Sequence, residues 1–216
     1  MAGYLIYHPK RREHTFDGVK VYFDDLSHNQ DPYLWNRCFL HTACHITQMK
    51  PEIGQTNFWI SGGGPALRST DQLVCDLVFV VAEQLAWADR NHLDRSDPLV
   101  DSDEAFVDHY GWYGPREHRW KTRTRHTLKA DPHQSFQPQR ADGSLVDIVP
   151  ALELAGIGLN QLRVEMRAGY QTRPFLLNHQ QVRTLYGWID DHAEVKLRGA
   201  ELQRIRLVNA DFFTGH

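Results

Sequence analysis

The residues best suited to chemistry in this sequence are three consecutive glycines, Gly62, Gly63 and Gly64, between two apolar segments. Glycines let the backbone approach a ligand closely and can point several N–H groups into one concavity, which holds an anion without a charged side chain. The run lacks the Gly-Lys-Ser/Thr ending of a Walker loop and the helical pattern that follows a dinucleotide fingerprint. It predicts a phosphate-binding turn, and the alternative is a plain turn between strands. The neighbouring side chains expected to contact phosphate or nucleotide are Trp59, Ser61, Arg68 and Ser69.

A basic segment at residues 119–126 is the second candidate. In an extended strand, alternate side chains share a face and lie ~7 Å apart, a spacing that suits the repeat of a phosphate backbone. An adjacent tryptophan could stack on a base. The alternative is a solvated edge strand whose charges prevent aggregation. The cations of this basic stripe are Arg119, Lys121, Arg123 and Arg125, with Trp120 beside them.

Two histidines, His41 and His45, are the only metal-ligand candidates that the sequence suggests. On a helix they would share a face and could bind one metal ion, whereas on a strand they would lie ~13 Å apart. The HExxH pattern of zinc hydrolases is missing because residue 42 is a threonine. Buried thiols and hydrogen-bonded histidines are the alternative, so we predict no metal and no cofactor.

Acid–base chemistry has one candidate pair, Asp108 and His109, followed by Tyr110. A carboxylate and an imidazole in a loop could serve as acid and base, but adjacent residues rarely point at one atom. The catalytic residues, if any, therefore stay unassigned.

The elements that must position these residues are predicted from periodicity. Strands are expected at residues 3–8, 19–23, 57–61, 73–82 and 202–208, the first two as neighbours joined by a basic turn at 9–13. The continuously apolar 73–82 segment predicts a central strand buried on both faces, and 34–49 slightly favours a strand over a helix. Helices are expected at 145–155, ending at Gly156, and at 178–193, with Asn178 as N-cap and Gln181 completing a capping box.

Length and composition predict one α+β domain spanning residues 1–216, with an irregular, charged insertion at about 89–142. Hydrophobic residues at 41% and charged residues at 24% are globular values, and no stretch is apolar enough for a membrane span. Three cysteines without a CxxC pair, and an N-terminus without a secretory pattern, favour the cytoplasm. The oligomeric state is left open.

The net charge of −3 hides a local segregation. Residues 94–108 contain six acidic residues against one basic, and residues 115–129 contain six basic residues against one acidic. The two segments could pair with each other, or the basic one could bind a polyanion.

Part of the sequence resembles the PUA, ASCH and EVE group of small β-barrel domains, in particular nucleotide-modification-associated domains. The residues that carry the resemblance lie at 53–55 (Ile-Gly-Gln), 58–62 (Phe-Trp-Ile-Ser-Gly) and 77–81 (Leu-Val-Phe-Val-Val), about a fifth of the chain. Such domains often have an aspartate after the first glycine, where this chain has Gln55. The resemblance implies a mixed or antiparallel, barrel-like sheet with two or three helices packed on it, holding a nucleobase or nucleotide beside the glycine turn.

Together these features predict a domain that binds or processes nucleic acid or nucleotides, with a link to modified nucleotides as the more specific form. One alternative is an enzyme of unknown class on a small phosphorylated or nucleoside substrate, with metal dependence through the segment 38–45 as one form of it. A second alternative is a non-catalytic interaction domain in which the acidic and basic segments pair.

Overall fold

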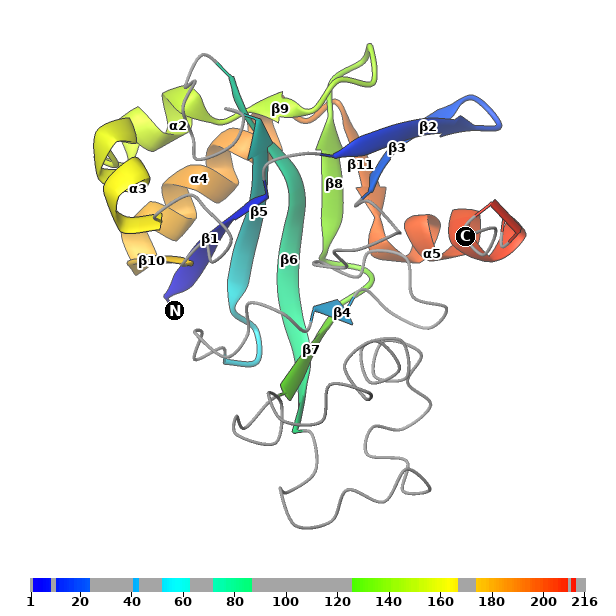
Figure 1. Cartoon of the computed structure of the whole chain (residues 1–216), viewed down its shortest axis with the longest axis horizontal. Coiled ribbons are helices and arrows are strands. Elements are labelled where there is room, and N and C mark those ends of the chain that lie inside the picture. The colour runs from blue at the N-terminus through cyan, green and yellow to red at the C-terminus, as the bar shows by residue number, and fades with distance from the viewer. Residues whose placement is uncertain are drawn as a thin grey trace, which may run out of the picture.

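The computed structural model describes residues 2–8, 11–23, 41–42, 52–62, 72–86, 126–166, 174–209 and 211–212. These residues form a mixed α+β fold in which helices pack on a large, mixed sheet (Figure 1). The predicted α+β class is confirmed. The sheet has nine strands, which are β1 (Gly3–His8), β4 (His41–Thr42), β5 (Thr56–Gly62), β6 (Leu73–Ala86), β7 (His126–Ala130), β8 (Phe136–Gln139), β9 (Val146–Asp147), β10 (Phe175–Leu177) and β11 (Val195–Arg198).

The main path of the sheet runs β10–β1–β5–β6–β7–β4, while β8 and β9 also pair with β6, and β11 pairs with β8. β1 and β5 are parallel, and the other pairs are antiparallel. The described strands form no closed barrel, so the barrel-like sheet implied by the resemblance stays a prediction.

The central strand predicted at 73–82 is confirmed as β6, which extends to Ala86. It pairs with β5 on one side and with β9, β8 and β7 in succession on the other. Leu77 and Phe79 enter one buried cluster, while Cys75 and Val78 enter another on the opposite face. The strand is continuously apolar because both of its faces are covered.

A separate two-stranded sheet is formed by β2 (Arg12–Phe16) and β3 (Val19–Phe23). The strand predicted at 19–23 is confirmed, but its expected pairing with residues 3–8 is wrong, because β1 lies between β10 and β5. The basic segment 9–13 is not the hairpin turn. Asp17 and Gly18 form the turn, with φ of 49° and 84°, and two positive φ values are what a two-residue type I′ turn requires.

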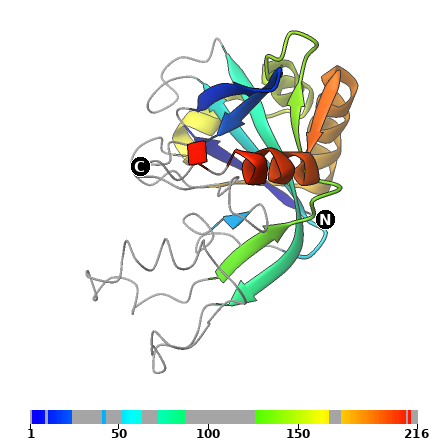
Figure 2. The same cartoon turned by 90° about the vertical axis from the view of Figure 1, so that its right-hand side faces the viewer.

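Helices cover the sheet unequally (Figures 1 and 2). On one face, α2 (Val149–Leu154), α3 (Leu159–Met166) and α4 (His179–His192) bury apolar side chains against β1, β5 and β6. On the other face, the β2–β3 hairpin and α5 (Gly199–Val208) contribute to a second cluster around β5 and β6. Four helices are therefore described, rather than the two or three expected.

The helix predicted at 178–193 is confirmed as α4. The Asn178 side-chain oxygen accepts a hydrogen bond from the Gln181 backbone N–H, and the Gln181 side-chain oxygen accepts one from the Asn178 backbone N–H, so the predicted capping box is formed. The helix predicted at 145–155 is shorter, because Val146–Asp147 pairs with β6 as β9 and only Val149–Leu154 is helical. It ends as expected before Gly156, whose φ is 69°.

The closing strand predicted at 202–208 is wrong, since these residues lie in α5. Leu202, Ile205 and Arg206 are buried at helical spacing. At the start of α5, Glu201 accepts a hydrogen bond from the Arg198 backbone N–H at 2.8 Å. In the described part of the chain, no helix combines the length and apolar character needed to cross a membrane.

Candidate functional site

The carboxyl ends of β1 and β5 lie side by side. The two strands are parallel, and the last residue pair in their register is His8 with Ser61. In open sheets with parallel strands, ligands bind outside the carboxyl ends of those strands. The first of the three glycines, Gly62, is the last residue of β5, so the predicted phosphate-binding turn begins at this edge.

The geometry at Gly62 admits no side chain. Its φ is 100°, a left-handed value that favours glycine, and a Cβ atom would lie 2.4 Å from the Gln72 carbonyl oxygen. The Tyr7 hydroxyl donates a hydrogen bond to the Gly62 carbonyl oxygen, which fixes the end of β5 to β1. The first glycine is therefore required by the backbone of this edge.

Two of the predicted contact residues precede Gly62 on β5. Ser61 is 4% exposed and lies next to the glycine, at the candidate edge. Trp59 is fully buried, and its ring packs against Phe79 with 5.0 Å between centroids. Trp59 therefore contributes to the core on the face that carries the hairpin, and its indole Nε1 has no hydrogen-bond partner within the described part of the chain.

An ion pair that the sequence analysis did not anticipate lies close to this edge. In the register of β5 and β6, Trp59 faces Leu77 and Ile60 faces Cys75, so Asp76 is the extra residue of a β-bulge. Bulges redirect side chains and are frequent next to functional sites. The Arg11 Nε donates to Asp76 Oδ2, with 3% of the arginine side chain and none of the aspartate side chain exposed.

Burial makes this ion pair energetically demanding. Charges removed from water require compensation, and among the described residues the second carboxylate oxygen, Asp76 Oδ1, has no hydrogen-bond partner. Burial, together with the charge of Asp76, raises the pKa of the adjacent Cys75 thiol well above its ordinary value. Cys75 therefore stays protonated near neutral pH and is a poor nucleophile.

The sequence alone indicates that Asp76 has an unusual environment. A charged residue within the apolar run of 73–81 indicates either a buried partner or a break in the alternation of the strand. The partner Arg11, 65 residues away, has no such signal, because basic residues near a turn are ordinary.

Most of the other predicted site residues lie outside the described residues, and their placement is untested. His41 is in β4, paired with Lys129 in β7, and nothing is described of its side chain. The candidates that fall outside are Gly63, Gly64, Arg68, Ser69, Arg119, Trp120, Lys121, Arg123, Arg125, Asp108, His109 and His45.

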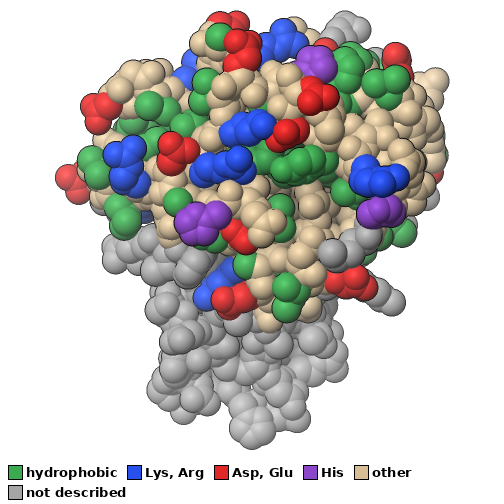
Figure 3. Space-filling model, turned by 180° about the vertical axis from the view of Figure 1, so that it is seen from behind, with side chains coloured by type: hydrophobic (Ala, Val, Ile, Leu, Met, Phe, Trp, Pro, Cys, Tyr) green, Lys and Arg blue, Asp and Glu red, His purple; other side chains and the backbone are tan. Residues whose placement is uncertain are grey.

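Within the described residues, no group of three His, Cys, Asp or Glu side chains is placed to hold a metal ion. On the described surface seen from behind, Lys and Arg side chains are interspersed with Asp and Glu (Figure 3). The described part of this face therefore presents no continuous basic field. Elsewhere in the described residues, Lys196 pairs with Asp190 at 2.6 Å.

Comparison of the chain with protein-family models, with curated proteins and with solved structures found no match to any of them.

Proposed function

We propose that this chain binds a nucleotide or nucleic acid at the edge where β1 and β5 end. The observation that carries the proposal is the position of Gly62. The first of three glycines ends a parallel strand, in a left-handed conformation, directly beside the carboxyl end of the neighbouring parallel strand.

The chemistry proposed for this edge is phosphate binding by backbone N–H groups of the glycine run, supplemented by Arg68 and Ser69. A phosphate held in this way needs no cofactor. In a longer ligand, the basic stripe from Arg119 to Arg125 would neutralise further phosphates and release their counterions.

The resemblance to nucleotide-modification-associated domains belongs to the same proposal. What supports it is that its three sequence segments lie together. Residues 58–62 are in β5, which pairs with residues 77–80 of β6. The Gly54 backbone N–H donates to the Val81 carbonyl oxygen, and the Val81 N–H donates to the Gln55 carbonyl oxygen. In its more specific form, the proposal is that a PUA-like cleft beside the glycine turn holds the nucleotide.

Fluorescence anisotropy with labelled single-stranded and double-stranded DNA and RNA tests the proposal. We expect binding at low salt that weakens steeply as salt increases. Arg123→Glu, in the basic stripe, should weaken binding by at least about tenfold, since it replaces a phosphate contact with a repulsive charge.

The matched control is Arg183→Glu, which makes the same charge change at an exposed position of α4, a helix on the sheet face opposite the β2–β3 hairpin. It should leave binding within about twofold of the original protein. Absence of binding to every nucleic acid at low salt, or equal losses in the two variants, would refute a specific basic interface.

A further inference from the structure

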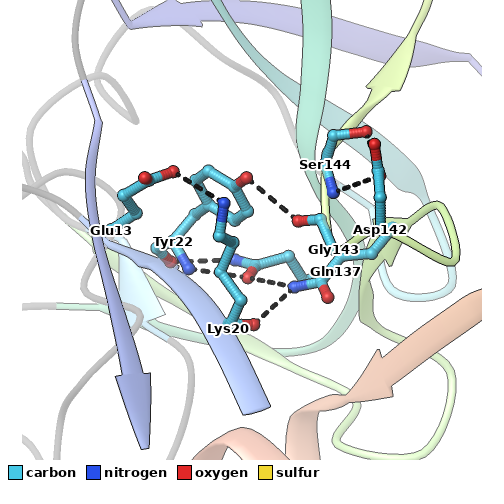
Figure 4. Close-up of polar contacts among 8 residues, drawn as sticks. Glu13, Lys20, Tyr22, Gln137, Asp142, Gly143 and Ser144 are labelled. Atoms are coloured by element: carbon cyan, nitrogen blue, oxygen red, sulfur yellow. Dashed lines mark hydrogen bonds and ion pairs between the residues drawn. The ribbon is translucent and has the colours of Figure 1, made fainter. Parts of the chain in front are cut away.

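The β2–β3 hairpin is attached to the rest of the molecule in an unusual way. Between it and the other described residues there is no backbone–backbone hydrogen bond. Its polar attachments to those residues run through side chains instead, mainly through two glutamines of β8 (Figure 4).

The Gln137 side chain makes the two hydrogen bonds to the Tyr22 backbone that a neighbouring strand could otherwise make. Its Oε1 accepts from the Tyr22 backbone N–H at 2.8 Å, and its Nε2 donates to the Tyr22 carbonyl oxygen at 2.8 Å. Gln139, two residues along the same strand face, donates from Nε2 to the Lys20 carbonyl oxygen at 2.7 Å and to Gln137 Oε1 at 3.3 Å. Both glutamines are buried, so this polar network is an internal interface.

Further described side chains add to the attachment. The Tyr22 hydroxyl donates to the Gly143 carbonyl oxygen at 3.0 Å, and burial raises the pKa of this phenol, which keeps the donor proton in place. The Arg11 side chain, immediately before β2, pairs with Asp76. Apolar contact comes from Phe16, Val21 and Phe23, which are buried in the cluster on this face.

Among the described residues, these attachments run through side chains, whereas backbone ladders join the strands of the main sheet. Of the described contacts, releasing the hairpin breaks these side-chain hydrogen bonds, the ion pair with Asp76, the apolar packing of its three buried side chains and the ring contacts that it makes with Phe212. It breaks no ladder of the nine-stranded sheet and leaves the cluster around α2, α3 and α4 on the opposite face intact. A unit that is joined to the described sheet by side chains, without a shared backbone ladder, can open at lower free energy than the whole chain.

We propose that the β2–β3 hairpin opens from the sheet and closes on it as one unit, while β5, β6 and the helices of the opposite face stay folded. Opening withdraws Arg11 from Asp76 and so exposes a carboxylate at the bulge of β6. The hairpin is thus a cover over a buried acidic group, built from residues 11–23.

Hydrogen exchange measured residue by residue on the full chain tests this cover. The Tyr22 amide is the direct reporter, because its described partner is the Gln137 side chain rather than a strand. We expect it to exchange together with the amides that pair β2 with β3, faster than the amides of β5 and β6 and with a smaller dependence on denaturant.

Two conservative variants separate opening of the hairpin from unfolding of the whole chain. Tyr22→Phe removes only the hydroxyl bonded to Gly143 and should speed hairpin exchange about fivefold, the factor for one ordinary hydrogen bond. Ile189→Val, on the opposite face, should speed β5 and β6 exchange about fivefold and leave the hairpin unchanged, because Ile189 stays packed when the hairpin opens.

Three results would overturn the proposal. Hairpin amides could accelerate in Ile189→Val by the same factor as those of β5 and β6, which means that they exchange only on global unfolding. Tyr22→Phe could leave hairpin exchange unchanged. The hairpin amides could also exchange at unrelated rates with no common denaturant dependence, which excludes opening as one unit.

Discussion

Replacement of Arg11 by methionine tests the buried ion pair that holds the hairpin to β6. The methionine fills much of the same space but leaves the Asp76 carboxylate, which is fully buried, without its charged partner. Asp76→Leu makes the complementary change, and the double variant removes both charges.

The expected magnitude follows from the burial of both groups. Removing one partner of a buried pair costs about 3–5 kcal/mol, because it leaves an uncompensated charge away from water. That is a large part of the roughly 5–15 kcal/mol by which a domain is stable. Replacing both partners with apolar side chains is often neutral or stabilising, so the double variant should be more stable than Arg11→Met.

Urea unfolding monitored by tryptophan fluorescence measures these free energies. The control is Glu13→Gln, which removes the partner of Lys20 from an ion pair at 3.4 Å whose two side chains are 33% and 56% exposed. Such a surface pair is worth less than about 1 kcal/mol. If Arg11→Met costs no more than Glu13→Gln, or if the two single losses simply add in the double variant, the buried pair does not have the role assigned to it.

Three further predictions concern the local structure. In urea unfolding, Gly62→Ala should destabilise the chain by at least about 1 kcal/mol more than Gly156→Ala does. Both glycines have positive φ, but of the two only Gly62 is so placed that a Cβ atom would collide with backbone. Asn178→Ala should cost about 1 kcal/mol and Asn178→Asp much less, because aspartate keeps the N-cap acceptor; equal losses would argue against the cap. Burial raises the pKa of Asp131, but the backbone N–H groups of His133 and Gln134 and the Gln134 side chain lower it by more, so the pKa lies below its ordinary value. Asp131→Ala should therefore be less stable than the original chain above about pH 4. Unfolding at several pH values should show that this difference in stability shrinks as the pH falls through the lowered pKa. A difference in stability that is independent of pH would contradict this prediction.

The parts of the fold that were predicted correctly from the sequence have strong local signals. The N-cap and capping box at Asn178 and Gln181 and the apolar run of β6 depend on neighbouring residues alone, and both predictions are confirmed. The Asp17–Gly18 turn is also a strong local signal for a hairpin, although the predicted pairing was based on the basic residues before it.

The parts that were wrong or missed depend on distant contacts. The residues of α5 contain an alternation at Ile205 and Leu207 that suits a strand, but burial of Leu202, Ile205 and Arg206 stabilises the helix. The bulge at Asp76 changes which β6 side chains share a face, and it appears only when β5 is paired with β6. The Gln137 contact with Tyr22 joins residues 115 apart, which no local pattern predicts.

Titration of the isotopically labelled protein with a short single-stranded oligonucleotide, observed by amide NMR, tests the proposed binding edge most directly. We predict that the amide signals of Ser61, Gly62 and Leu73 shift first, that the signals of α4 stay in place, and that added salt reverses the shifts. Saturable binding that leaves the signals of β1, β5 and the start of β6 unchanged, or no shift at all at low salt, would contradict a nucleotide site at this edge.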